Sequence, residues 1–307
     1  MKTPDDAPVR GQKRTKPWRR VTHGVFIRHR PGLPAQSEFR RDLRAWLMVL
    51  PAGSVFTGVT AAVLLGWHVP KLLEHMPVFA ATRSSRRPRR PGLICSRLTH
   101  ASTPGWVGGL PVDTAEEILL RCARDLELLD LLILLEGALQ AGHVDEERMA
   151  VVLASRRPGV RLLREAWEEC TGKAESAGET VLQKFHRCMN VAFEAQKNLF
   201  DDDGHLVARA DLWIVGTTRF HEYDGDVHRR PGVHRGDLRR ERGLGRTTYL
   251  RRSYTLDDLL NHSLVTMHEM DRDLGRPHVI RRHHQWLKLV EQSLYSPVGR
   301  ERIMNRW

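Results

Sequence analysis

Residues 206–225 read LVARADLWIVGTTRFHEYDG, and their pattern is the strongest indication of the fold of the C-terminal part of the chain. It predicts two strands of a hairpin that are separated by a turn at Gly216. Asp211 lies in the first strand, and Glu222 and Asp224 end the second. Because side chains alternate along a strand, Glu222 and Asp224 are expected to point to one face, with Asp211 beside them.

The segments around this hairpin predict an α/β unit. The expected order is a helix, three strands, a helix, a strand and a helix, at 179–191, 193–200, 206–215, 218–223, 233–244, 247–252 and 256–274. An antiparallel run of strands followed by a helical crossover to another strand is typical of an α/β sandwich. The small, polar run 171–177 marks the expected boundary before this unit.

The carboxylates of the hairpin predict a metal site. Three carboxylates at one sheet edge repel one another unless a divalent cation lies among them. All-oxygen ligands suit Mg²⁺ or Mn²⁺, so Asp211, Glu222 and Asp224 are the predicted ligands. Such an ion can activate water and neutralise charge on a cleaved phosphodiester. His228 can serve as general base or orient water, and Glu179 is a fourth acid. Each of these residues alone would more often be a solvated cap, so the prediction depends on their combination.

The same residues resemble the PD-(D/E)XK superfamily, and more narrowly the very-short-patch-repair-like endonuclease domains often found in actinobacterial proteins. The matching residues are Arg209-Ala210-Asp211, Glu222-Tyr223-Asp224-Gly225 and His228. The resemblance implies a restriction-endonuclease-like sandwich over 176–275 in which Asp211 and Glu222 are metal ligands and Glu179 supports them. It also implies a basic helix facing DNA, and the DNA-contacting residues predicted in this domain are Arg209, Arg235, Arg239, Arg240 and Arg242.

One position departs from the superfamily motif, which ends in Lys. Position 224 is Asp, so the Lys that would stabilise the pentavalent phosphate is missing. His228 or Arg239 is expected to supply the positive charge in its place.

Composition favours a nucleic-acid partner. The 307 residues carry 49 Lys and Arg against 37 Asp and Glu, a net charge of +12, and they are 41% hydrophobic, enough for two packed domains. A GC-rich genome that encodes Arg in place of Lys is the alternative explanation of the basic excess.

The four cysteines lie far apart without a CxxC pair, and there is no apolar leader, which favours a reducing cytoplasm. The Leu-rich run 126–139 is too short and too charged to cross a membrane, so it is expected to be a core helix.

The N-terminal part resembles the AbiEi-type antitoxins. Residues 19–27 (RRVTHGVFI) resemble the wing strand of their winged helix, and residues 50–58 (LPAGSVFTG) with Ala61-Ala62 match the segment that follows. The helix-turn-helix that should precede the wing is absent or eroded into the basic arm before Trp18, so specific reading of the major groove is not expected. The expected organisation is a basic arm at 1–17, a largely helical region with a small β element at 18–175, the nuclease-like unit at 176–275, and a basic helical tail at 276–307.

An arginine-rich segment follows the predicted strand 77–82 and precedes the predicted strand 93–98. As the tip of a hairpin it is expected to lie along a phosphate backbone, although a solvated loop is equally compatible with its sequence. Its candidate DNA contacts are Arg86, Arg87, Arg89 and Arg90.

These observations lead to one hypothesis and two alternatives. The leading one is a Mg²⁺- or Mn²⁺-dependent DNA endonuclease or nickase with an antitoxin-like N-terminal module. Its expected partner is duplex DNA, a homodimer is compatible with this hypothesis, and no membrane partner is expected. The first alternative is a non-catalytic DNA-binding regulator of the toxin–antitoxin kind, and the second is an RNA-directed nuclease.

Overall fold

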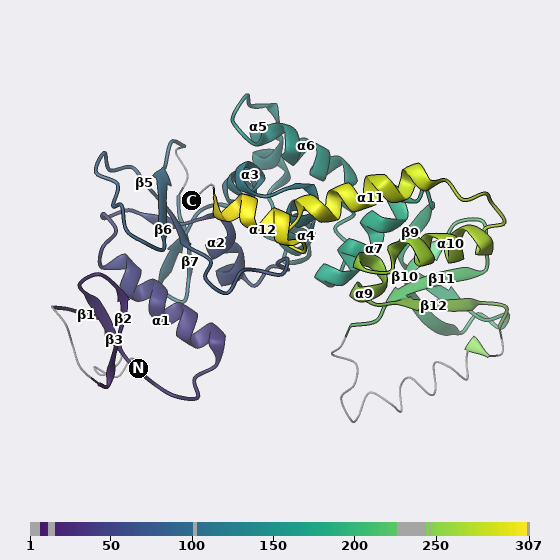
Figure 1. The fold of residues 1–307 in the computed structure, drawn as a ribbon, viewed down its shortest axis with the longest axis horizontal. Helices are drawn as coiled ribbons and strands as arrows, with labels where there is room; N and C mark the ends of the chain where they lie inside the picture. The colour runs from purple at the N-terminus through teal and green to yellow at the C-terminus, as the bar shows by residue number, and fades with distance from the viewer. Residues whose placement is uncertain (1–6, 12–15, 101–102, 226–243, 246, 306–307) are drawn as a thin grey trace.

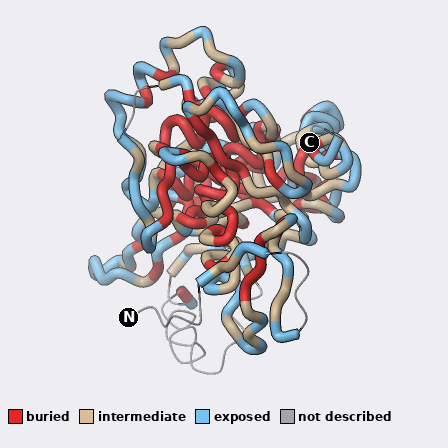
Figure 2. The backbone as a smooth tube through the Cα atoms, turned by 90° about the vertical axis from the view of Figure 1, so that its left-hand side faces the viewer, coloured by how far each residue is buried: buried red, intermediate tan, exposed pale blue. Residues whose placement is uncertain are grey.

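The computed structural model describes residues 7–11, 16–100, 103–225, 244–245 and 247–305. The chain is a mixed α+β protein with three sheets. Two sheets lie at the N-terminal end of the elongated molecule and the third lies at the opposite end, with helices between them (Figure 1). Buried segments gather in the interior of the body, whereas the exposed ones form its rim and loops (Figure 2).

The first sheet is small and contains the wing-like sequence. Its strands β1 (Val9–Arg10), β2 (Trp18–Thr22) and β3 (Val25–Arg28) are antiparallel in the order β1-β3-β2. Gly24 lies in the turn between β2 and β3 with a φ of 74°, a conformation that glycine adopts without strain. The helix α1 (Ala35–Leu47) packs on this sheet, where Ala45 contacts the buried Val25 and Ile27.

The second sheet corrects one expectation. Its five strands, in the order β6-β5-β4-β8-β7, are β4 (Val55–Phe56), β5 (Val78–Thr82), β6 (Leu93–Arg97), β7 (Gly105–Val107) and β8 (Leu110–Val112). The hairpin predicted between β5 and β6 is wrong, because these two strands are parallel. Residues 83–92 therefore carry the chain back along the sheet instead of forming a tight turn. A connection of that length permits a return, whereas a hairpin commonly uses two to five residues.

The helices of the N-terminal half form its main core. They are α2 (Gly58–Leu65), α3 (Ala115–Asp125), α4 (Leu128–Gln140), α5 (Glu146–Ala154) and α6 (Val160–Glu169). The predicted core helix is confirmed as α4, which is buried along nearly its whole length. The β content of this half was underestimated, since β4, β7 and β8 are two or three residues long and carry no periodic signal.

The expected boundary at 171–177 is a connection held against α4. The Glu136 carboxylate, on α4, accepts hydrogen bonds from the Thr171 N–H at 2.6 Å, the Thr171 hydroxyl at 3.0 Å and the Ala174 N–H at 3.3 Å. A buried carboxylate that accepts several N–H and O–H donors fixes the segment that carries them. The helix α7 (Ala177–Cys188) follows directly.

The third sheet contains four strands that follow one another along the chain in the predicted order. The strands β9 (Phe193–Phe200), β10 (Leu206–Ile214) and β11 (Arg219–Tyr223) form an antiparallel meander, and β12 (Leu250–Tyr254) pairs with β11 in parallel. The helix predicted at 233–244 lies largely outside the described residues. The predicted helix 256–274 is divided into α9 (Leu256–Leu260) and α10 (Ser263–Asp273).

The C-terminal tail is helical, as predicted, and it contacts both halves of the molecule. It comprises α11 (Ile280–Gln292), which contacts α4, and α12 (Pro297–Met304), and both run across the middle of the molecule in Figure 1. Trp286 is fully buried, stacks edge-on against Phe185, and donates its indole N–H to the Leu259 carbonyl at 2.7 Å. Beyond it, the Leu294 N–H donates to both oxygens of Asp130 on α4 at 3.1 Å. Within the described part of the chain, no helix has the length and apolar character needed to cross a bilayer.

Candidate functional site

A row of polar residues crosses the third sheet. The pairing of Leu212 with His221 places Asp211 opposite Glu222, and Glu222 itself pairs with Ser253 of β12. On the other side, the partners of Ala195 and Lys197 place Gln196 opposite Asp211. Cross-strand neighbours lie about 4.5–5.5 Å apart at Cβ, so these side chains are within reach of one another.

Glu179 reaches this row from the first turn of α7. Its Oε2 accepts hydrogen bonds from the Gln196 Nε2 at 3.0 Å and from the Glu175 N–H at 2.8 Å. The same Gln196 Nε2 lies 3.4 Å from the Asp211 Oδ1, so one amide bridges two carboxylates. Burial raises the pKa of Glu179 to about 7; the Glu175 hydrogen bond opposes this rise, and the Asp211 charge adds to it. The structure therefore brings the helix acid and the strand acid together.

The Asp211 side chain is also held by the neighbouring strand. Its Oδ2 accepts a hydrogen bond from the Tyr223 N–H at 2.9 Å. A backbone donor at this position orients the carboxylate, which leaves the Oδ1 toward Gln196. The result is an acid whose two oxygens have separate, defined surroundings.

Glu222 is buried and lies beside a cation that the sequence did not suggest. The Arg251 Nη1, on β12, is 3.8 Å from the Glu222 Oε2, and the Glu222 side chain is only 11% exposed. Sequence reasoning assigned the missing positive charge to residues after β11, because the parallel pairing that brings Arg251 next to Phe220 is not visible in the sequence. Gln196 was missed for a similar reason, since one amide in a strand carries no signal of its own.

The predicted ligands form a looser group than expected. Asp224 is exposed just beyond the end of β11. Among the described residues, the one group of His, Cys, Asp or Glu that places its ligand atoms within 4.8 Å of one another is Asp201, Asp203 and His205. Those residues belong to the exposed β9–β10 turn, where Asp201 already accepts the N–H groups of Asp203 and His205. Asp211, Glu222 and Asp224 do not form such a compact group.

The other predicted residues are distributed unevenly. His228, Arg235, Arg239, Arg240 and Arg242 lie outside the described residues. Arg209 is half exposed and pairs with Glu175 at 2.7 Å, close to the acids. In the N-terminal half, Arg86, Arg87 and Arg89 are exposed. Arg90 instead donates to the His23 carbonyl at 2.6 Å, which ties the arginine-rich segment 83–92 to the β2–β3 turn.

A buried histidine pair lies between α7 and the sheet. The His186 Nε2 is 2.8 Å from the His221 Nδ1, and the His186 Nδ1 is 2.8 Å from the Leu182 carbonyl. Burial lowers the pKa of His186 to about 4 and that of His221 to about 2, so both rings are neutral near pH 7. Both are shielded from solvent. We interpret this pair as a structural support of α7 that lies apart from the acidic row.

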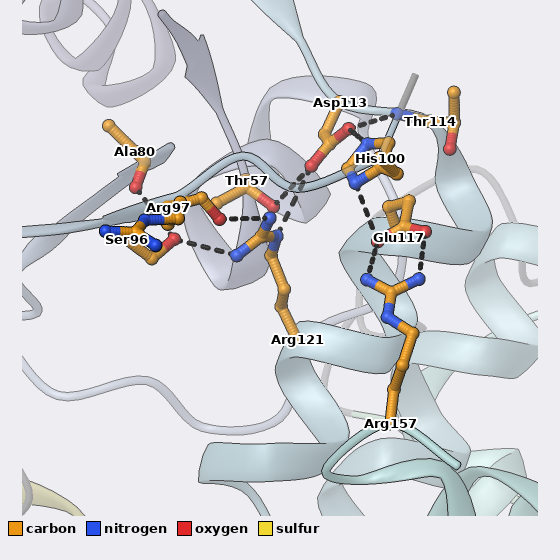
Figure 3. A network of polar contacts seen from close by, with 10 residues as sticks. All are labelled: Thr57, Ala80, Ser96, Arg97, His100, Asp113, Thr114, Glu117, Arg121 and Arg157. Carbon is orange, nitrogen blue, oxygen red and sulfur yellow. Dashed lines mark hydrogen bonds and ion pairs between the residues drawn. The ribbon is translucent and has the colours of Figure 1, made fainter. Parts of the chain in front are cut away.

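A second polar network lies in the N-terminal half (Figure 3). Asp113, which lies just before α3, contacts His100 at 2.9 Å and the Arg121 Nε at 3.4 Å. On α3, Glu117 forms a two-point pair with Arg157 at 2.5 Å. Arg121 also donates to the Ser96 hydroxyl of β6 at 2.8 Å. Asp113, Glu117 and Arg121 are buried, so these contacts join α3 to the sheet and to the loop before α6.

Comparisons of the chain with protein-family models, with curated proteins and with solved structures found no match. The function is therefore inferred from the geometry of the acidic row.

Proposed function

We propose that residues 176–275 form a divalent-cation-dependent phosphodiesterase that cleaves DNA, with the restriction-endonuclease-like architecture that the sequence resemblance implies. The observation that carries this proposal is the alignment of Asp211 with Glu222 across β10 and β11, with Glu179 joined to Asp211 through Gln196. The antiparallel meander β9–β11, followed in the chain by the fourth strand β12, supports it, since the sequence pattern predicts this order of elements.

The chemistry of the residues fits a hard cation. Glu179, Asp211 and Glu222 offer carboxylate oxygens, the ligand type preferred by Mg²⁺ and Mn²⁺. When bound, such an ion supplies an activated water and offsets charge on the phosphodiester. The Tyr223 N–H orients Asp211, and Arg251 provides positive charge beside Glu222. The basic surface of the chain then brings the polyanion to the acids.

Nicking of supercoiled plasmid tests this function. Wild-type protein, D211A and D203A are purified in parallel and assayed with Mg²⁺ or Mn²⁺. We expect wild type and D203A to nick the plasmid and D211A to bind DNA without cutting it. Asp203 is an informative control, because it belongs to the other acidic group, at the β9–β10 turn. Equal activity of D211A and wild type, or loss of activity in D203A alone, would contradict the assignment.

A second candidate is a DNA-binding regulator without catalysis. It is favoured by the exposed Arg86, Arg87 and Arg89 in the N-terminal half and by the loose spacing of the predicted ligands. Tight, salt-sensitive binding of duplex DNA without cleavage in either metal would support it. Cleavage of RNA but not of DNA under the same conditions would instead support an RNA-directed nuclease.

A further inference from the structure

Gln196 has an unusual backbone conformation for a strand residue. Its φ is +55°, in the middle of β9, and the other non-glycine residue with a positive φ in the described part of the chain is Asn190. Asn190 follows the end of α7, where Asn commonly adopts this conformation, whereas a Gln in a strand has no such local reason. Backbone strain of this kind persists where the surrounding structure over-determines it, often at functional sites.

The nitrogen and the oxygen of the Gln196 amide have different surroundings. Its Nε2 donates to the Glu179 Oε2 at 3.0 Å and lies 3.4 Å from the Asp211 Oδ1. Its Oε1 is buried and has no hydrogen-bond partner among the described residues. Among these residues, no hydrogen bond of the Oε1 therefore holds the terminal amide in this orientation.

We propose that Gln196 is a further ligand of the divalent cation, through its amide oxygen. This inference rests on the proposed function of the acidic row. Without a cation, the amide N–H lies between two carboxylates and reduces their repulsion. A half-turn of the terminal amide exchanges its nitrogen and oxygen, because both are bonded to the same carbon. The Oε1 then faces the position of the cation together with the carboxylate oxygens of Glu179 and Asp211. An amide oxygen is a suitable ligand for these ions.

A purely structural role makes a different prediction. If Gln196 acts only as a hydrogen-bond donor to the two acids, then Gln196→Glu removes the donor and adds a third negative charge. Gln196→Glu would then bind the cation as weakly as a variant that lacks the side chain. If Gln196 is a ligand, Gln196→Glu retains an oxygen and increases the negative charge, so it should bind the cation at least as well as wild type.

Isothermal titration of the full-length protein with Mn²⁺ distinguishes these roles. The variants are Q196G, Q196E and N198A. Glycine tolerates the positive φ, so Q196G removes the side chain without adding backbone strain. Asn198 is an exposed amide two residues further along β9 and serves as the matched control.

We expect Q196G to weaken Mn²⁺ binding by roughly 10-fold or more, with Q196E and N198A binding as tightly as wild type or more tightly. Far-ultraviolet circular dichroism and thermal unfolding of each variant verify its fold. Equal affinity of Q196G and wild type would overturn the ligand role, as would Q196E binding as weakly as Q196G. The proposed metal-dependent function itself fails if the wild type does not bind Mn²⁺, or if D211A binds it as tightly as the wild type. Failure of the ligand role of Gln196 alone would leave the binding by wild type and its loss in D211A unchanged, so the two failures are distinguishable.

Discussion

Gly178 packs directly against the ring of Tyr223. A Cβ at position 178 would lie 2.1 Å from the Tyr223 Cε1 and Cζ, a distance at which the ring would have to move. Gly178 immediately precedes Glu179 on α7, and Tyr223 immediately follows Glu222 on β11. This contact therefore sets the distance between the helix that carries one acid and the strand that carries another.

G178A is expected to destabilise the protein by about 1–3 kcal/mol, because the added methyl group overpacks the contact between α7 and β11. Thermal and denaturant unfolding measure the loss. The double variant G178A/Y223A should lose less than the sum of the two single changes, since removal of the ring makes room for the methyl group. Strictly additive losses would show that the two residues do not interact.

Arg251 is expected to support catalysis without holding the cation. R251A should reduce plasmid nicking by roughly 10²-fold, the usual effect of removing one group that stabilises transition-state charge, and R251K should recover part of the activity. Mn²⁺ affinity should stay the same or rise, because a competing cation has left Glu222. Arg252 is the control, since it pairs with Glu269 and Asp273 of α10 at 2.7 and 2.8 Å. Equal loss of nicking in R252A would indicate a general effect of the strand.

Asp130 is expected to make stability depend on pH. Burial raises its pKa from 3.8 to about 7, while the Leu294 N–H and Arg302 oppose the rise. Between about pH 4 and pH 7 the folded protein therefore holds a proton that the unfolded chain has released. The contribution of Asp130 to stability falls as pH rises through this range, by about 4 kcal/mol at most.

D130N removes this titration and keeps one oxygen to accept the Leu294 N–H. As the pH rises from 4 to 8, the free energy of unfolding of the wild type should fall relative to that of D130N. Denaturant unfolding across this range measures the shift. A constant difference between the two proteins would mean that Asp130 titrates normally.

The arginine-rich segment 83–92 is expected to contribute to DNA affinity and not to cleavage chemistry. The triple variant R86A/R87A/R89A should bind duplex DNA more weakly and with a shallower dependence of log K on log salt. The slope should fall by about 0.9 for each phosphate that these arginines neutralise in the wild type. Arg90 is left in place because it anchors the segment to His23. Fluorescence anisotropy at several salt concentrations gives the slope.

A charge-matched control separates a local contact from the effect of net charge. The three exposed arginines Arg148, Arg156 and Arg161, on and around α5 and α6, serve this purpose. If R148A/R156A/R161A changes the slope equally, the segment 83–92 has no special role.

The local sequence was sufficient to predict most elements because their signals lie within a few residues. The pattern of α6 matched Val160–Glu169, and β9 matched Phe193–Phe200. Turn and cap signals were equally local, as with Gly66, which ends α2 with a φ of 75°. Strands of two or three residues escaped detection because they are too short to show alternation.

The relationships between elements were harder to predict, because they join residues far apart in the chain. The parallel pairing of β5 with β6 reversed the expected path of the arginine-rich segment. The tail was expected only as a basic helical appendage, yet its Leu294 N–H binds Asp130, 164 positions earlier in the chain.

For the candidate site, local sequence patterns were enough to predict which acids are available and that Asp211 and Glu222 lie on neighbouring strands. Alternation and turn chemistry are local properties, and they set the register of a hairpin. The bridge that Gln196 forms between Glu179 and Asp211, and the position of Arg251 beside Glu222, depend on tertiary packing. Those contacts depend on the packing of α7 and on the parallel addition of β12, and the free energy of both comes from burying side chains contributed by distant parts of the chain.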